Sequence, residues 1–248
     1  MRAFKGAGAI SLAQYSSGAS FDLRNFIEVG NASDYNRSFS QQDNTVPNFL
    51  TAAGGTWASQ SRLDQIDGGF TLYDWSPSNL ALVLWGNTNT LAATAIVGEA
   101  HVIKSGGFIP TKRIINTSIA PVVKKGATVV AATDYTVSTG GILIKSTIGT
   151  ATILDGDAIT IDYTPQAGFD VQALVNAAPL VSVFFNGVNA YDNKPCTDRV
   201  WKARLGVAQN FNLIGTELSN LPLTMKIELD DTIVGAGLSQ YFAHQGVL

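Results

Sequence analysis

Short segments rich in β-branched residues, separated by glycine-containing turns, are the feature of this chain that most restricts its fold. The turns are predicted at Gly140-Gly141, Ile148-Gly149 and Asp155-Gly156, and Ile159–Thr164 alternates apolar and polar residues. Strict alternation places successive side chains on opposite faces of a strand, and closely spaced turns are typical of a small sandwich. The pattern predicts an all-β fold and an immunoglobulin-like β module within residues 99–165.

The segments on either side of this module also predict strands. Gly6–Tyr15, Phe21–Gly30 and the alternating Ser33–Gln41 come before it. After it, strands are expected up to a last one in Leu221–Thr232, with a short helix in Phe211–Asn220. The charge also changes: residues 101–165 carry six basic and four acidic residues, whereas the rest carries ten and fifteen. We predict a split β core, residues 1–98 and 166–248, with the module inserted at 99–165.

The stretch TLYDWSPSNLALVLWGN, Thr71–Asn87, predicts one flanking helix. Ser76 suits the N-cap, Pro77 the first helical position, where its missing N–H costs nothing, and Gly86 the position after the end. The run LALVLW within it is apolar on every side. The helix is therefore either sunk in its own core or covered on its far side by another subunit.

A long polar passage, Ser40–Gln60, lacks a sustained period and predicts a loop. Large apolar residues interrupt it at Val46, Phe49, Leu50 and Trp57. Loops longer than about 12–15 residues in a compact domain are usually functional or disordered. The apolar residues favour a loop that docks on another surface.

Composition excludes several classes of function. Hydrophobic residues make up 46% of the chain and charged residues only 14%, which fits either a sparingly charged globule or a surface that faces copies of itself. The net charge of −3 argues against a protein that binds nucleic acid by neutralising phosphates. No apolar run approaches the ~18 residues of a membrane-spanning helix, and the start has no signal-peptide pattern. We expect no membrane anchoring.

No catalytic, metal or cofactor site is predicted. His101 and His244 are the only histidines and Cys196 the only cysteine, too few and too scattered for a metal site by spacing. No Gly-x-Ser-x-Gly elbow is present. The Asp155-Gly156-Asp157 turn lacks the closing glutamate of a calcium loop. We expect a protein that is not an enzyme.

Four pieces of the chain, taken in order, carry a family resemblance. They are the Val29-Gly30-Asn31 turn, the helix start Ser76–Ala81, the strand Asp155–Thr164, and the FNGVNA hairpin at 185–190 with Asn193-Lys194-Pro195. In this order the chain resembles the major tail tube proteins of long-tailed bacteriophages. The resemblance covers nearly the whole chain through packing-type patterns.

The resemblance implies a β-sandwich or barrel subunit that closes hexameric rings, which stack into a tube for DNA. The implied partners are other copies, the tape-measure protein, and the tail terminator and tail-tip proteins; phage DNA would pass the lumen without specific binding. The implied location is the virion tail, assembled in the host bacterial cytoplasm. An inserted outer module leaves little room for a sheath, which favours a non-contractile tail. The residues assigned to contacts between subunits and rings are Val46, Phe49, Leu50, Trp57, Leu80 and Leu84.

Two alternatives stay open. One is a ring protein of a tail tip or of a type VI secretion tube, which would share the ring geometry. The other is an adhesin-like β-sandwich that binds a surface through residues 101–165, where the slight basic excess lies.

Overall fold

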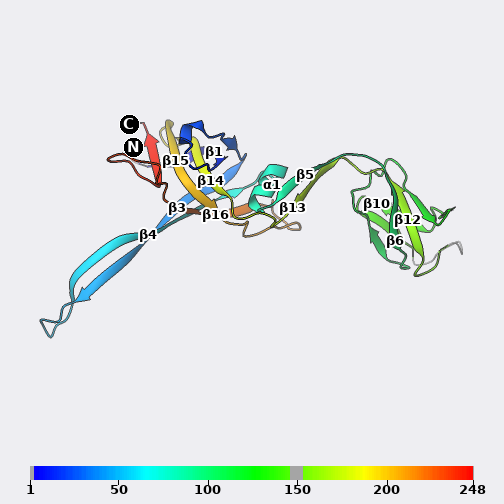
Figure 1. The fold of residues 1–248 in the computed structure, drawn as a ribbon, viewed down its shortest axis with the longest axis horizontal. Helices are drawn as coiled ribbons and strands as arrows, with labels where there is room; N and C mark the ends of the chain where they lie inside the picture. The colour runs from blue at the N-terminus through cyan, green and yellow to red at the C-terminus, as the bar shows by residue number, and fades with distance from the viewer. Residues whose placement is uncertain (1–2, 146–152, 248) are drawn as a thin grey trace. The chain divides into compact units, whose positions relative to one another are not determined.

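The computed structural model describes residues 3–145 and 153–247 and shows an all-β protein (Figure 1). The predicted turn at Ile148-Gly149 lies outside the described residues. The chain divides into two compact units: unit 1, Met1–Thr88 with Val171–Leu248, and unit 2, Asn89–Asp170. Unit 2 begins earlier and ends later than the 99–165 segment expected from the sequence.

Unit 1 is organised around one eight-stranded sheet. Its strands are β1 (Gly6–Gln14), β2 (Ile27–Glu28), β3 (Ala32–Pro47), β4 (Thr56–Leu72), β14 (Leu180–Asn189), β15 (Lys194–Leu205), β16 (Leu221–Ile227) and β17 (Phe242–Gly246). Their order is β2-β1-β14-β15-β16-β4-β3. β15 also pairs with β17, through residues 196–200, whereas it pairs with β16 through residues 203–205. A single turn of 3₁₀ helix, Phe21–Leu23, lies between β1 and β2.

Alternation along these strands builds the core of unit 1. In β16, Leu221, Leu223, Met225 and Ile227 are buried, and the residues between them are exposed or half-buried. Apolar residues of β1, β4, β14 and β15 complete the same cluster. The sequence expectation of a last strand at 221–232 was wrong in two ways: β16 ends at Ile227, and β17 follows it.

The helix α1 (Pro77–Val83) begins as predicted. The Ser76 hydroxyl accepts the Asn79 N–H at 3.3 Å, and Pro77 occupies the first turn. Leu80 and Val83 are buried in the core of unit 1, and Leu82 and Leu84 pack against that core. The helix is therefore core structure of its own chain, and Leu80 offers no accessible contact surface.

The helix ends one residue earlier than the sequence indicated. Trp85, not Gly86, has the left-handed backbone, with φ of 49°. Gly86 is required for a different reason: a Cβ there would lie 2.4 Å from the Gln172 carbonyl oxygen.

Unit 2 holds two small sheets with a core of their own. One contains β7 (Phe108–Pro110), β10 (Tyr135–Ser138) and β11 (Gly141–Ile144), and the other contains β6 (Ile96–Val102), β8 (Val122–Lys125), β9 (Thr128–Val129) and β12 (Ala158–Tyr163). Twelve buried residues fill the space between them, including Ile159, Ile161 and Tyr163 of β12. The turn predicted at Asp155-Gly156 is confirmed. The remaining strands, β5 (Asn87–Leu91) and β13 (Gly168–Gln172), pair with each other.

Candidate functional site: an exposed β-hairpin arm and its anchor

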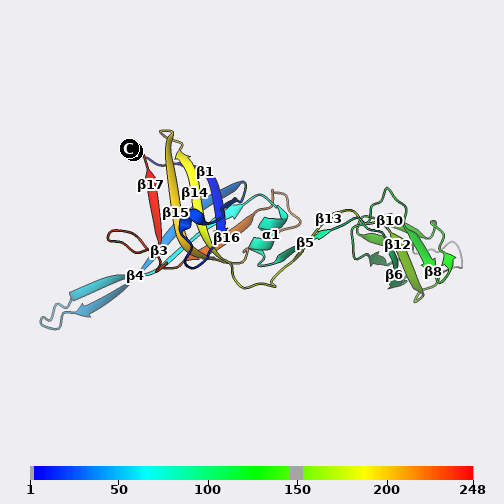
Figure 2. The same ribbon diagram turned by 45° about the horizontal axis from the view of Figure 1, so that its top comes forward.

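The outer part of the β3–β4 hairpin, residues 40–65, forms an arm that leaves the sheet (Figures 1 and 2). Its two strands pair with each other from Ser40 and Gln65 outward, whereas β16 pairs with β4 only from Ile66 onward. Every arm residue except Asn48 is exposed. The prediction of a loop at 40–60 was therefore wrong. The passage belongs to a two-stranded ribbon in which β3 and β4 form hydrogen bonds only with each other.

The arm showed no strand period in the sequence because neither of its faces is buried. Cross-strand neighbours are polar on both faces: Asn44 lies opposite Gln60 on one face, and on the other the Ser61 hydroxyl donates to the Asp43 carboxylate. An isolated two-stranded hairpin is marginally stable in water, and its unpaired outer edges are free to pair with another chain. The arm therefore has the properties of a segment that a partner completes.

The tip of the arm carries apolar side chains into solvent. Phe49 and Leu50 are each 84% exposed and Trp57 is 68% exposed, with Val46 beside them. The Asn48 N–H donates to the Gly55 carbonyl at 2.7 Å, and the Asn48 Oδ1 accepts the Leu50 N–H at 2.8 Å. These bonds order the loop and hold Phe49 and Leu50 outward. Large apolar side chains exposed together at the end of one hairpin favour an interaction surface.

Four of the six residues assigned to contacts lie together at this tip, and two do not. Val46, Phe49, Leu50 and Trp57 form the tip, whereas Leu80 and Leu84 belong to the helix region. Phe39 and Leu63 are also exposed on this hairpin and were missed. Both are single large apolar residues in polar strands, which is the signal that identified Trp57.

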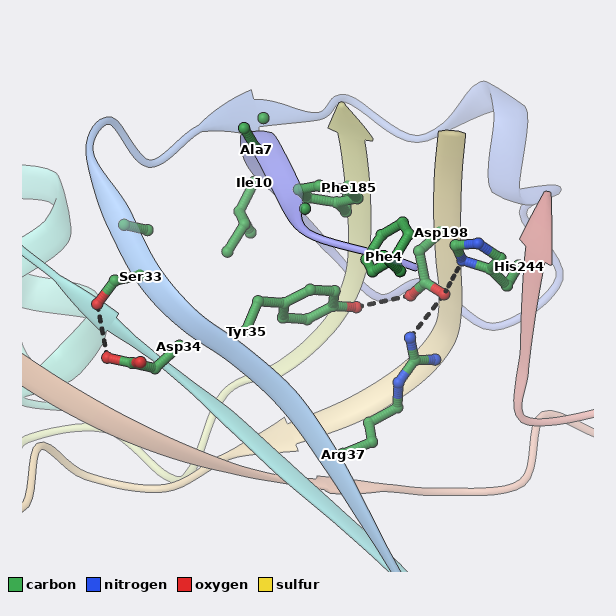
Figure 3. A pocket seen from close by; sticks show the side chains of 13 residues that line it. Phe4, Ala7, Ile10, Ser33, Asp34, Tyr35, Arg37, Phe185, Asp198 and His244 are labelled. Atoms are coloured by element: carbon green, nitrogen blue, oxygen red, sulfur yellow. Dashed lines mark hydrogen bonds and ion pairs between the residues drawn. The ribbon is translucent and has the colours of Figure 1, made fainter. Parts of the chain in front are cut away.

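A buried carboxylate, Asp198 on β15, anchors the root of the arm (Figure 3). The Tyr35 hydroxyl donates to its Oδ2 at 2.8 Å, and Arg37 Nη2 lies 2.6 Å from its Oδ1. His244 Nδ1 of β17 lies 3.4 Å from the same oxygen. Removing one partner of a buried pair leaves an uncompensated charge, which is strongly destabilising. The network therefore ties β3 to the middle of the sheet.

Aromatic contacts fix the same crossing. The Tyr35 ring stacks on Phe185 with centroids 5.8 Å apart, and the Arg37 guanidinium lies 4.3 Å from the Phe242 ring centroid. Phe39 also packs on Phe242, at 6.0 Å. Burial and the nearby Asp198 carboxylate raise the pKa of the Tyr35 hydroxyl. This hydroxyl therefore stays protonated and acts as a hydrogen-bond donor.

Two backbone features shape β3 and β4 inside the sheet, before the arm begins. Asp34 has a φ of 57° within an irregular stretch of the ladder between Ser33 and Asn36, and such bulges bend a strand. On β4, a Cβ at Gly69 would lie 2.4 Å from the Leu223 carbonyl oxygen. The glycine allows β16 to approach β4 closely inside the sheet, three residues before their pairing ends at Ile66.

A second buried carboxylate, Glu99, lies in unit 2 and is also held by structural donors. The Tyr163 hydroxyl donates to its Oε2 at 2.7 Å, and the Lys112 N–H donates to its Oε1 at 3.0 Å. His101 Nε2 lies 2.8 Å from the same Oε1. Burial would raise the pKa of this carboxyl, but the three donors outweigh it and the pKa lies below its usual 4.5. The arrangement fastens the 111–113 segment to β6 and β12.

Neither carboxylate belongs to a cluster of metal-ligating residues. Within residues 3–145 and 153–247, no group of three or more His, Cys, Asp or Glu side chains is placed to hold a metal ion. In the same part of the chain, no helix is long and apolar enough to cross a membrane.

Comparison with known proteins finds a family model that spans both units. This model, described as protein of unknown function UCP028589, matches residues 3–245. No curated protein matches the chain. The family match thus includes the arm, its anchor and unit 2.

Proposed function

The chain belongs to the family UCP028589, and we propose that it is a structural protein whose copies assemble into rings that stack as a tube. The proposal takes as its functional parallel the major tail tube proteins of long-tailed bacteriophages, which the order of sequence motifs resembles. The proposed product is a hexameric ring with a lumen for DNA, in a non-contractile tail.

The arm is the observation that supports self-assembly most strongly. It orders 26 residues, 40–65, of which all but Asn48 are exposed. Fixing the backbone of each residue costs about 1–2 kcal/mol, and the arm regains little of this by burial within its own chain. A contact with another copy would bury the tip and pair the free edges, and would thereby offset the cost.

The edges of the sheet in unit 1 support the same conclusion. At one end stands β3, and at the other stands β2, which has only two residues and leaves most of β1 without a neighbour on that side. Open edges invite pairing with another chain. A closed ring of copies satisfies such edges without an unlimited sheet.

The remaining parts of the proposal follow from the tail-tube parallel. The expected partners are other copies, a tape-measure protein, and terminator and tail-tip proteins. The assembled protein would reside in the virion tail after assembly in the host cytoplasm. The 15 acidic and 10 basic residues outside residues 101–165 favour a lumen that repels phosphates within about a Debye length, roughly 8 Å at physiological salt.

Light scattering coupled to gel filtration, followed by negative-stain electron microscopy, tests the proposal. We expect the purified protein to form rings or tubes at high concentration. The decisive variant replaces residues 42–62 with Asn-Gly, because Gln41 and Leu63 face each other directly and a two-residue turn can join such a pair. This short-arm variant should stay monomeric and unfold cooperatively, with a circular dichroism spectrum that loses only the contribution of the removed strand residues.

A substitution within the arm shaft provides the control. Ser59→Ala keeps the arm and its tip, and should assemble like the parent. A parent protein that stays monomeric in several salts, or a short-arm variant that assembles normally, would contradict the proposal. Single rings that never stack would favour a tail-tip ring over a tube.

A second candidate function rests on unit 2. Because unit 2 has a hydrophobic core of its own, its fold does not depend on the arm. Unit 2 could bind a surface glycan as an adhesin-like module. Binding of the short-arm variant to a glycan array would favour this function.

A further inference from the structure

A second exposed apolar surface of unit 1 lies at the end of β4 opposite the arm tip. We call it the platform, and it consists of Tyr73, Trp75, Phe211, Leu213, Ile214 and Leu218. Ile214 is 97% exposed, Leu218 90% and Leu213 73%. The sequence had predicted a short helix in 211–220, but the segment is irregular. It therefore presents these side chains outward rather than along one helical face.

The platform is held in shape by specific contacts. The Trp75 ring stacks on Phe211 with centroids 5.2 Å apart, and its Nε1–H donates to the Ser219 carbonyl at 3.2 Å. The Ser219 hydroxyl donates to the Asn212 carbonyl at 2.6 Å. Between these residues lies a hollow of about 450 Å³, lined by Tyr73, Trp75, Leu213 and Leu218 among others.

We infer that this hollow receives the arm tip of a second copy of the chain. The inference rests on the proposed function and names the surface that the arm contacts. Residues 44–61, which include the tip, contain no charged residue, and Glu217 is the only charge in 207–219. Phe49 and Leu50 are side chains of the size and polarity that such a hollow buries without leaving a charge desolvated.

The tip cannot reach the platform of its own chain, so in an assembly of copies the platform that it contacts belongs to a neighbour. Trp57 lies at the start of β4 and Tyr73 follows its last residue. A strand rises about 3.3 Å per residue, so the 17 residues of β4 separate the two by roughly 50 Å. The contact joins two different surfaces and is therefore heterologous, the type that generates rings or stacks rather than twofold dimers.

The available area indicates that one such contact is too small to hold a pair. Aromatic side chains bury roughly 150–250 Å² each, so Phe49, Trp57 and Leu50 can cover only about 500 Å² on each partner. A stable interface buries about 1,200–2,000 Å² in total. Each copy must therefore give one tip and receive another, with further contacts along the arm shaft. Assembly should accordingly depend steeply on concentration.

Cysteine cross-linking between two populations of the full chain tests this contact. Cys196 is the only cysteine of the chain and is buried, so introduced thiols react selectively. Leu50→Cys and Leu213→Cys are made in separate preparations, mixed, oxidised with copper phenanthroline and analysed on non-reducing gels. We expect a cross-linked dimer in the mixture and little in either preparation alone.

A competing hollow of about 310 Å³ beside α1, lined by Leu12, Ile27, Leu82 and Leu180 among others, provides the matched control. Mixing Leu50→Cys with Ile27→Cys should give no cross-link, and a cross-link there in place of Leu213 would overturn the inference. Assembly of the parent without any Leu50–Leu213 cross-link would overturn it too, but would leave the proposed function standing. A parent that never assembles would remove both.

A substitution in the platform tests the same contact without cross-linking. Leu218→Ser should raise the concentration at which assembly begins by about tenfold or more, which corresponds to about 1.4 kcal/mol. Leu174→Ser, at a residue that is 68% exposed elsewhere on unit 1, should leave that concentration unchanged. Equal effects of the two substitutions would contradict a specific role for the platform. If Leu218→Ser fails to fold, the cross-linking result decides alone.

Discussion

The arm of unit 1 and the sheets of unit 2 are both antiparallel β-structure, yet their side chains are in opposite environments. In unit 2, Ile159, Ile161 and Tyr163 alternate with more exposed residues and fill a core. In the arm, every residue except Asn48 is exposed, and the only cover comes from the cross-strand neighbour. Unit 2 can be stabilised by its own burial, whereas the arm depends on its root and on a partner.

Composition reflects this difference. The strands of unit 2 are rich in Val and Ile, which suit a pleated and half-buried surface. The arm is built largely from Ser, Thr, Gln and Asn, and its large apolar residues other than Leu63 lie at the tip. Polar strands resist indiscriminate edge pairing, so specificity is left to the tip. Unit 2 therefore has the composition of a self-contained core, and the arm has the composition of a solvent-exposed ribbon with an apolar end.

The largest expected effect is at the anchor. Asp198→Ala leaves the Arg37 guanidinium without its carboxylate, and should lower the free energy of unfolding of unit 1 by about 3–5 kcal/mol. Amide exchange in residues 40–65 should rise as well, because the root no longer fixes the arm. Urea unfolding and exchange mass spectrometry measure the two effects. The exposed Asp64→Ala serves as control, and an unchanged arm in Asp198→Ala would show that the arm is stable by itself.

Removing core volume from unit 2 should affect that unit alone. Ile161 is fully buried between β6 and β8, and Ile161→Ala should destabilise unit 2 by about 2–5 kcal/mol. Exchange in the arm should not change, because Ile161 belongs to the separate core of unit 2. A loss of protection in both units would refute their independence.

Acid should weaken unit 2 through Glu99. Its pKa in the folded protein lies below the usual 4.5, so its stabilising contribution is complete above pH 4.5 and is lost as the pH falls through the folded value. Glu99→Gln should make unit 2 less stable at pH 7 and flatten the pH dependence of its stability below pH 4.5. Thermal unfolding across this range measures it. Tyr163→Phe, which removes one donor, should shift the acid transition to higher pH.

The smallest effect on folding is expected at the arm tip, together with a large effect on assembly. Trp57→Ser changes an exposed residue of β4, and the monomer should keep its stability within about 0.5 kcal/mol. Phe70→Ala, on the same strand but 2% exposed, should cost about 3–5 kcal/mol. Light scattering should show weaker assembly for Trp57→Ser. A strongly destabilised Trp57→Ser monomer would mean that the tip packs within its own chain.

Much of the fold could be predicted because it depends on neighbours in the sequence. The Ser76 cap and the Asp155-Gly156 turn each depend on a few adjacent residues. The alternation in Ile159–Thr164 reports burial on one face directly. The tip residues were also identified, because large apolar groups in a polar passage are visible without any structure.

The arm as a ribbon, its anchor and the platform were not predictable in this way. A strand exposed on both faces has no hydrophobic period, so Ser40–Gln60 was read as a loop. Nothing in the sequence around Asp198 marks it as buried. Its partners Tyr35 and Arg37 lie 163 and 161 positions away in the sequence, and only the fold brings them together.

The sequence by itself therefore determined the all-β class, the turn at Asp155-Gly156, the start of the helix and the identity of the apolar tip. These properties follow from local backbone preferences and from the alternation of side chains. Only the tertiary structure decided which polar residues are buried together, which helix residues enter the core and which two apolar surfaces remain open. Those outcomes depend on pairing between strands far apart in the chain, and the residues of a single segment do not encode that pairing.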